Sequence, residues 1–285
     1  MFAIFLLTLG WASSLTASCC SSGSSGGIGR LLPHERALVE LSQDARLVVG
    51  SFDDQGQFIS GMPDHLPYWQ FNHELQVMTR LSHFFLPFVK IPVRTQLSRV
   101  RTGSHLADLV LGARWPLSLY GINIVSSVQL PTGSTCNAQS SNQIESLSGL
   151  GAWLLALGVM YEHSLKAWLM GVGYNINLEP RIFKSEGFSS GPQHAPFLSL
   201  GYPIHENGFL NGTLSAMFSH RARLKDQAVA DSAKQKISAS LGYNLRLHSH
   251  LSLTSSLGAD IALSHWAKNV NSEVFMRLGL RVGVF

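Results

Sequence analysis

The feature that most constrains the fold of this chain is an alternation of apolar and polar side chains with a period of two residues. In the stretch 166–178, Trp168 and Val172 fall on one face of an extended strand, whereas Gly171 and Asn175 fall on the other. Successive side chains of a β-strand point to opposite faces. Each such stretch therefore predicts a strand with one apolar face.

The alternation recurs in about twelve segments, each roughly the 9–11 residues that a tilted membrane strand needs. The clearest are 85–97, 105–117, 166–178, 235–247 and 273–285, and weaker ones lie near 45–51, 68–81, 121–131, 150–161, 195–203, 209–221 and 251–263. Longer polar connections such as 133–148 and 181–194 alternate loosely with short ones such as 248–250. Short turns on one side and long loops on the other are typical of outer-membrane barrels, and an even strand count puts both termini on the same side.

The composition also favours a membrane protein. Charged residues make up 13% of the chain and hydrophobic residues 45%, whereas an average globular domain carries about twice as much charge. No run approaches the roughly 20 apolar residues of a membrane-spanning helix, which leaves a closed barrel as the way to cross a bilayer. We therefore expect an all-β fold, an antiparallel transmembrane β-barrel of about twelve strands over residues 45–285. A soluble sandwich or lipocalin-like barrel also alternates, but here Arg, Lys and Asp lie deep in the polar faces.

The first 44 residues differ from the rest. Residues 1–18 combine an apolar stretch with small residues near its end, as a signal peptide does, although no Lys or Arg precedes that stretch. Residues 15–19 resemble the lipobox of bacterial lipoproteins, which makes Cys19 a candidate for lipidation, with ordinary cleavage as the alternative. Residues 19–44 predict a Ser/Gly tether followed by a short helical or irregular segment, either periplasmic or a plug.

The end of the chain predicts where the protein is delivered. Its last residues resemble the signal that the barrel-assembly machinery reads in bacterial outer-membrane proteins. The residues that carry this resemblance are Arg277, Gly279, Val282, Val284 and Phe285. The bacterial outer membrane, membrane lipids and the assembly machinery are the location and partners that follow.

The polar faces of the predicted strands carry the candidate lumen-lining residues. These are Lys90, Arg94, Asp108, Arg114, Lys236, Arg246, Asp260, Arg277 and Arg281. An excess of basic groups would attract anions into a passage. Alternatively, the same groups form a self-neutralising ladder that holds a narrow lumen shut. A barrel of about twelve strands is near the size at which side chains either fill the interior or leave a small channel.

Three segments resemble one family in the order that the family has them. Residues 101–115, 125–134 and 148–153 are similar to strands of the outer-membrane transporter-like barrels of the MetA-pathway phenol-degradation group, which are distantly akin to long-chain fatty-acid channels. His105 stands where glycine is common in that family. The resemblance implies a channel for small, often apolar or aromatic compounds.

Other functions find less support in the sequence. The net charge of +4 comes from scattered residues without a basic block, so nucleic-acid binding is not expected. Cys136 has no partner at metal-ligand spacing, and no metal or cofactor is predicted. His220, His248 and His250 lie near strand ends, with Ser249 beside them, but no nucleophile elbow or carboxylate pair accompanies them, so we expect no enzyme. We expect a channel or transporter for small apolar or anionic solutes. The alternatives are a closed structural or surface-binding barrel, lipid-anchored in one version, and an outer-membrane lipid hydrolase.

Overall fold

The computed structural model describes residues 35–285 with several gaps. The residues left undescribed in this range are 54, 61–68, 98–101, 118–120, 134–152, 166–167, 179–187, 190, 222, 225–226, 229–232, 262–266 and 268–269. The predicted signal peptide, the lipidation candidate Cys19 and the tether up to residue 34 lie outside the described residues. No helix among the described residues is long and apolar enough to span a membrane.

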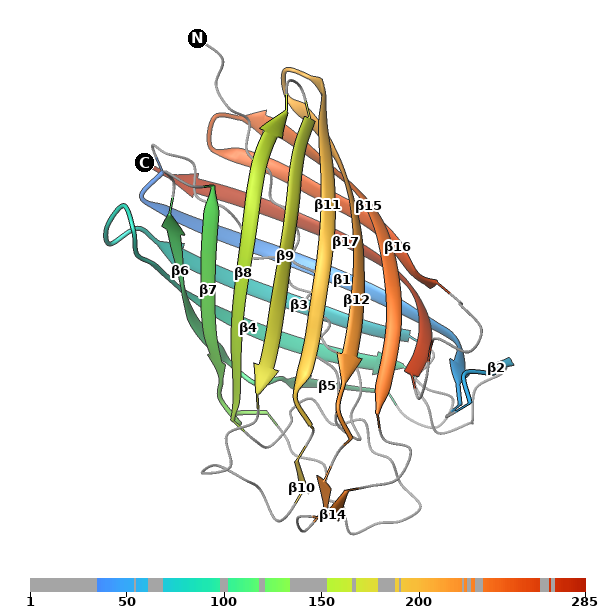
Figure 1. Ribbon diagram of the computed structural model, residues 1–285. Helices are drawn as coiled ribbons and strands as arrows, with labels where there is room; N and C mark the ends of the chain where they lie inside the picture. Colours follow the sequence, from blue (N-terminus) through green and yellow to red (C-terminus); the bar gives the residue numbers. More distant parts are fainter. Residues whose placement is uncertain are drawn as a thin grey trace.

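Twelve antiparallel strands form a closed barrel, as the alternation predicts (Figure 1). In barrel order they are β1 (Ala37–Phe52), β3 (Trp69–Thr79), β4 (Leu86–Leu97), β6 (Val110–Leu117), β7 (Ile122–Gln129), β8 (Leu154–Leu165), β9 (Trp168–Leu178), β11 (Gln193–His205), β12 (Gly208–Ser219), β15 (Lys234–His248), β16 (Leu251–Ile261) and β17 (Val270–Val284). Two short strands extend the sheet, β2 (Phe58–Ser60) beside β1 and β5 (Thr102–Leu106) beside β4. A separate small sheet consists of β10 (Phe188–Ser189), β13 (Arg223–Leu224) and β14 (Gln227–Ala228).

The barrel closes where the first strand pairs with the last. The register of β1 and β17 runs from Ala37 opposite Val284 to Phe52 opposite Val270, with a bulge after Val48. Closure leaves no free strand edge at this seam, because the backbone groups of β1 and β17 pair with each other. A barrel in a membrane needs such pairing, since lipid cannot form hydrogen bonds with a free edge.

The start of β1 corrects one prediction. Residues 37–44, which were assigned to a helical or plug segment, form the first half of β1. The helix-like reading followed Leu38, Val39 and Leu41, which fit a helical spacing. However, Leu38, Glu40 and Ser42 are buried while the residues between them are more exposed, which is the period of a strand.

The connections differ in length at the two ends of the barrel. Five strand pairs, β3–β4, β6–β7, β8–β9, β11–β12 and β15–β16, are joined by at most six residues at the end where β17 terminates, here called the turn end. The other strand ends form the loop end, where the sequence between consecutive barrel strands is longer and where β10 and β14 lie (Figure 1). This asymmetry is the one that the sequence predicts.

The outer surface of the barrel is an apolar belt. Outward side chains such as Leu75, Leu111, Val159, Val172, Leu200, Leu214, Leu241, Leu257 and Leu278 are between 37% and 60% exposed. Trp168 packs on Tyr202 near the turn end, and Trp69 stacks on Phe71 near the loop end. An apolar band with aromatic residues toward both rims matches the surface that membrane barrels present to lipid.

Candidate functional site

The interior of the barrel is the candidate site, and one side of it carries most of the charge. We call this side the charged wall, and it comprises Glu40, Asp44, Arg46, Glu74, Lys90, Arg94, Lys236, Asp260, Glu273, Arg277 and Arg281. These residues come from β15, β16, β17, β1, β3 and β4, which are neighbours in the barrel. Their side chains alternate with the outward apolar ones, so they point inward.

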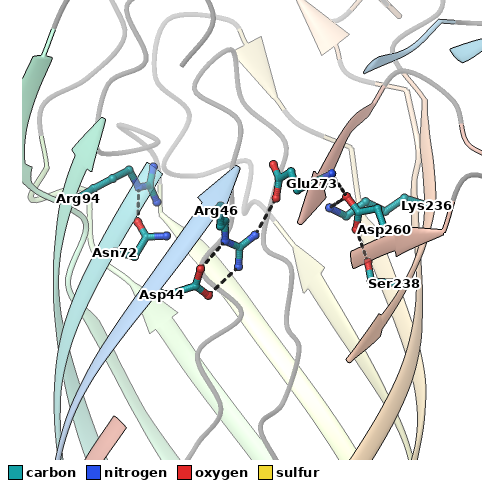
Figure 2. A network of polar contacts seen from close by, with 8 residues as sticks. All are labelled: Asp44, Arg46, Asn72, Arg94, Lys236, Ser238, Asp260 and Glu273. Carbon is teal, nitrogen blue, oxygen red and sulfur yellow. Dashed lines mark hydrogen bonds and ion pairs between the residues drawn. The ribbon is translucent and has the colours of Figure 1, made fainter. Parts of the chain in front are cut away.

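A first chain of contacts crosses the charged wall at Arg46. Its guanidinium donates to both carboxylate oxygens of Asp44, at 2.9 and 3.1 Å, and to Glu273 Oε2 at 3.1 Å. The backbone N–H of Glu273 donates to Asp260 Oδ2 at 3.0 Å, and Lys236 Nζ donates to the same oxygen at 3.1 Å. Figure 2 shows this chain, with Ser238 on the far side of Asp260 and the Arg94–Asn72 pair on the other flank.

A second group of ion pairs lies nearer the turn end. Arg277 Nη2 donates to Ser42 Oγ at 3.0 Å and lies 3.5 Å from Glu40 Oε1. Lys90 Nζ donates to Glu74 Oε1 at 3.2 Å. Arg281 Nη2 lies 2.5 Å from Glu35 Oε2, close to the point where β1 begins.

Most acidic residues of this wall are absent from the predicted lumen residues, which are mainly basic; Asp260 is the exception. Glu40 and Glu74 pair with the predicted Arg277 and Lys90. Asp44 and Glu273 pair with Arg46. Arg46, the centre of the first chain, was missed as well. The alternation in 45–51 and 68–81 could have found two of these residues, Arg46 and Glu74. For this wall, the paired contacts favour the ladder interpretation over an unopposed basic field.

Three of the predicted lumen residues lie apart from the charged wall. Asp108 is 2% exposed and accepts hydrogen bonds from the Gly133 N–H at 2.8 Å and from Gln129 Nε2 at 2.9 Å. Asp108 therefore links the segment before β6 to Gln129, the last residue of β7, and to the Pro-Thr-Gly segment that follows this strand. Arg114 donates to Asn123 Oδ1 at 2.8 Å, and Arg246 donates to the His248 carbonyl at the turn end.

The opposite side of the interior has a different chemistry, and we call it the uncharged wall. It consists of the inward faces of β9, β11 and β12, three strands that contain no Asp, Glu, Lys or Arg. Its buried polar residues are Asn175, Asn177, Gln193, Ser199, Asn211, Thr213, Ser215 and Ser219. The interior is thus divided between ion pairs on one side and amides and hydroxyls on the other.

Several buried carboxamides have unused hydrogen-bonding capacity. Neither the amide nitrogen nor the carbonyl oxygen of Gln70 and Gln76 has a partner among the described residues. The same holds for Asn175 Nδ2, Asn177 Oδ1 and Gln193 Oε1 on the uncharged wall. Buried polar groups in folded proteins are almost always hydrogen-bonded, to protein or to water. Their partners therefore lie outside the described residues, in another part of the chain, in water or in a solute.

Glycine residues let aromatic rings pack closely against neighbouring strands inside the barrel. The ring of Phe197 covers Gly173, where a Cβ would come within 2.3 Å of the ring, and the ring of Phe88 covers Gly112, where the distance would be 2.4 Å. Phe275 covers Gly258 in the same way. These glycines are therefore needed for packing inside the barrel.

The residues of the predicted assembly signal belong to the closing strand and its end. Val282 and Val284 face outward, and Gly279 is buried. Phe285 follows the strand and packs edge-on against His250, with ring centroids 4.0 Å apart. Recognition of this strand by the assembly machinery stays a prediction.

The described residues offer few arrangements suited to catalysis or metal binding. His248 and Ser249 lie 3.0 Å apart, but they are sequence neighbours in an exposed turn. Among the described residues, no group of three or more His, Cys, Asp or Glu side chains is arranged to hold a metal ion.

Comparison with known proteins identifies the fold but no sequence family. No protein-family model and no curated protein matches the sequence. The COG4313 outer membrane channel from Pseudomonas putida F1 superposes with a TM-score of 0.69 at 13% identity, over 88% of this chain and 96% of that one. The CymD monoaromatic hydrocarbon channel superposes with a TM-score of 0.50 at 10% identity, over 87% of this chain and 88% of that one. The chain thus has the fold of outer-membrane channel barrels, while no sequence comparison links it to the phenol-degradation group.

Proposed function

We propose that this protein is a channel of the bacterial outer membrane through which small molecules diffuse passively. The observation that carries the proposal is the closed barrel fold, which the chain shares with the COG4313 outer membrane channel. The buried carboxamides without a partner among the described residues agree with a wet interior, because water or a solute can satisfy them. A carboxamide left without any partner costs about 1–3 kcal/mol. The apolar belt and the fold support the membrane location, with lipids and the assembly machinery as partners.

The division of the interior supports the passage of neutral solutes. Much of the fixed charge of the charged wall is taken up in ion pairs such as Arg46–Glu273 and Lys90–Glu74. The uncharged wall offers amides and hydroxyls, which exchange hydrogen bonds with a passing solute as they do with water. Such an interior has weak attraction for ions and many sites for polar, uncharged groups.

Labelling of single cysteines tests whether the interior is wet. In a background without the three native cysteines, Gln76→Cys is expected to react with a water-soluble, membrane-impermeant thiol reagent in proteoliposomes. Leu75→Cys is the matched control, because Leu75 precedes Gln76 on β3 and faces outward, 37% exposed, where lipid would cover it. If Gln76→Cys is as unreactive as Leu75→Cys, the interior is dry and the proposal fails.

A closed structural or surface-binding barrel is the second candidate. The contacts that cross from β1 through β17 and β16 to β15 favour it, because such a ladder also stabilises a filled interior. Proteoliposomes separate the two candidates, since a closed barrel passes no solute even after residues 19–34 are removed.

A further inference from the structure

Apolar side chains form a collar inside the barrel toward its turn end. The collar consists of Leu38, Met78, Leu86, Phe88, Val125, Met160, Phe197 and Phe209, with Val110 and Leu169 packed against it. Its eight principal members are at most 7% exposed. Leu38, Met78, Leu86 and Phe209 are each the first or second residue from the turn end of their strands.

The collar runs around most of the circumference. Its members come from β1, β3, β4, β6, β7, β8, β9, β11 and β12, which follow one another without a break in barrel order. In the remaining sector, Gly283 of β17 lies opposite Leu38, and the carboxylate of Glu35 covers this glycine while pairing with Arg281. The remaining sector comprises β15, β16 and β17, and the Glu35–Arg281 ion pair lies at its β17 edge.

The collar and the carboxamides lie in series along the barrel. Gln70, Asn177 and Gln193 are within two residues of the loop ends of β3, β9 and β11, whereas most of the collar lies nearer the turn end. Val110, at the loop end of β6, and Gln76, the inward neighbour of Met78 on β3, lie where the two layers meet. Because the strands form a closed wall, a solute that crosses the barrel meets both layers. The first layer offers hydrogen bonds and the second offers apolar contact.

An apolar layer discriminates against charge. An ion that enters it loses water without gaining a partner, which is costly, and apolar constrictions in channels act as barriers for this reason. An uncharged molecule with an apolar part loses little hydration free energy when it enters the apolar layer. Two members of the collar, Met78 and Met160, are unbranched and flexible, so they can adapt to a passing body.

We propose that the collar is the selectivity element of the barrel, which admits uncharged molecules that carry both an apolar body and hydrogen-bonding groups and excludes ions. The inference rests on the proposed function, because it assumes that solutes cross the interior. It departs from the expectation of an anion passage, which followed from the basic candidates alone.

A matched pair of solutes tests the inference on the unmodified protein. Phenyl glucoside and phenyl glucuronide differ by one carboxylate, and their uptake into proteoliposomes can be measured by swelling or by absorbance. We expect the glucoside to enter at least about tenfold faster, as for a barrier difference of about 1.4 kcal/mol. Equal rates would overturn the collar inference and leave the channel standing, whereas uptake of neither solute would overturn the proposed function.

Methionine-to-glutamine variants locate the barrier, because they change polarity and keep the shape of the side chain. Met78→Gln and Met160→Gln should raise the KCl conductance in planar bilayers and the glucuronide uptake several-fold. Met217→Gln is the control, since Met217 is also buried and inward-facing but packs with Phe52, Ala267 and Val270 outside the collar. An equal rise in Met217→Gln would show that the collar is not the barrier. Phe209→Tyr, which adds one hydroxyl, is the alternative if a glutamine variant fails to fold.

Discussion

At the scale of single residues, Arg46 is the group on which the charged wall most depends. It is 2% exposed, binds Asp44 and Glu273 at once, and lies over the ring of Phe275. Removing one partner of a buried ion pair leaves the other charges uncompensated, which costs about 3–5 kcal/mol. Water in the interior would lower this figure.

We therefore expect Arg46→Met to lower the urea concentration at which the refolded protein unfolds, measured by tryptophan fluorescence in detergent. Adding Glu273→Gln to Arg46→Met removes one of the stranded carboxylates and should recover part of the loss. An Arg46→Met variant as stable as the parent would mean that the ladder contributes nothing to folding.

Glycine packing gives a second prediction at this scale. Gly173→Ala places a methyl group against the ring of Phe197 and near the Val159 carbonyl, and such overpacking costs about 1–3 kcal/mol. Gly212→Ala is the matched control, because the nearest atoms to its Cβ would be 4.0 Å away. Comparable unfolding midpoints for the two variants would contradict the packing described for Phe197.

At the scale of elements, β17 shows how far the sequence could predict the fold. Its alternation predicts a strand with Leu278, Leu280 and Val282 on the apolar face, and these residues are exposed on the outer surface. The start of β1 was missed because Leu38, Val39 and Leu41 also fit a helix. The ion pairs could not be predicted at all, since pairs such as Arg46–Glu273 join residues far apart in the chain, and their register is set only when the barrel closes.

The depth of a residue on β17 should determine the cost of a charge on its outer face. Leu278→Arg places a cation near the middle of the strand, where membrane barrels lose about 2–4 kcal/mol, whereas Val284→Arg at the turn end should cost about 0–1 kcal/mol. Refolding into lipid vesicles, followed by the shift of the folded band on gels, measures both. Equal effects at the two positions would argue against a bilayer around this surface.

The end of β17 separates assembly from stability. Phe285 follows the last residue of β17, and its ring contacts His250 outside the barrel strands, so its deletion should leave refolding in detergent nearly unchanged. In cells the same deletion should reduce the amount of folded barrel, because the terminal residues are the expected recognition signal. Full cellular assembly without Phe285 would refute its part in that signal.

At the scale of the whole molecule, the sequence predicts the outer surface of the barrel better than its interior. The apolar exterior and the strand count follow from the alternation, whereas the division of the interior into a charged wall, an uncharged wall and a collar depends on which strands become neighbours. Leu38 and Phe209, for example, are distant in the chain and join one cluster only in the closed barrel.

The entry of a small neutral sugar into vesicles that contain the refolded protein tests the central claim most directly. We predict that vesicles with the protein swell in an isotonic solution of glucose, and that vesicles with the heat-unfolded protein do not. If a preparation that runs as a folded, heat-modifiable band gives no swelling above protein-free vesicles, the barrel is closed and the channel account is wrong.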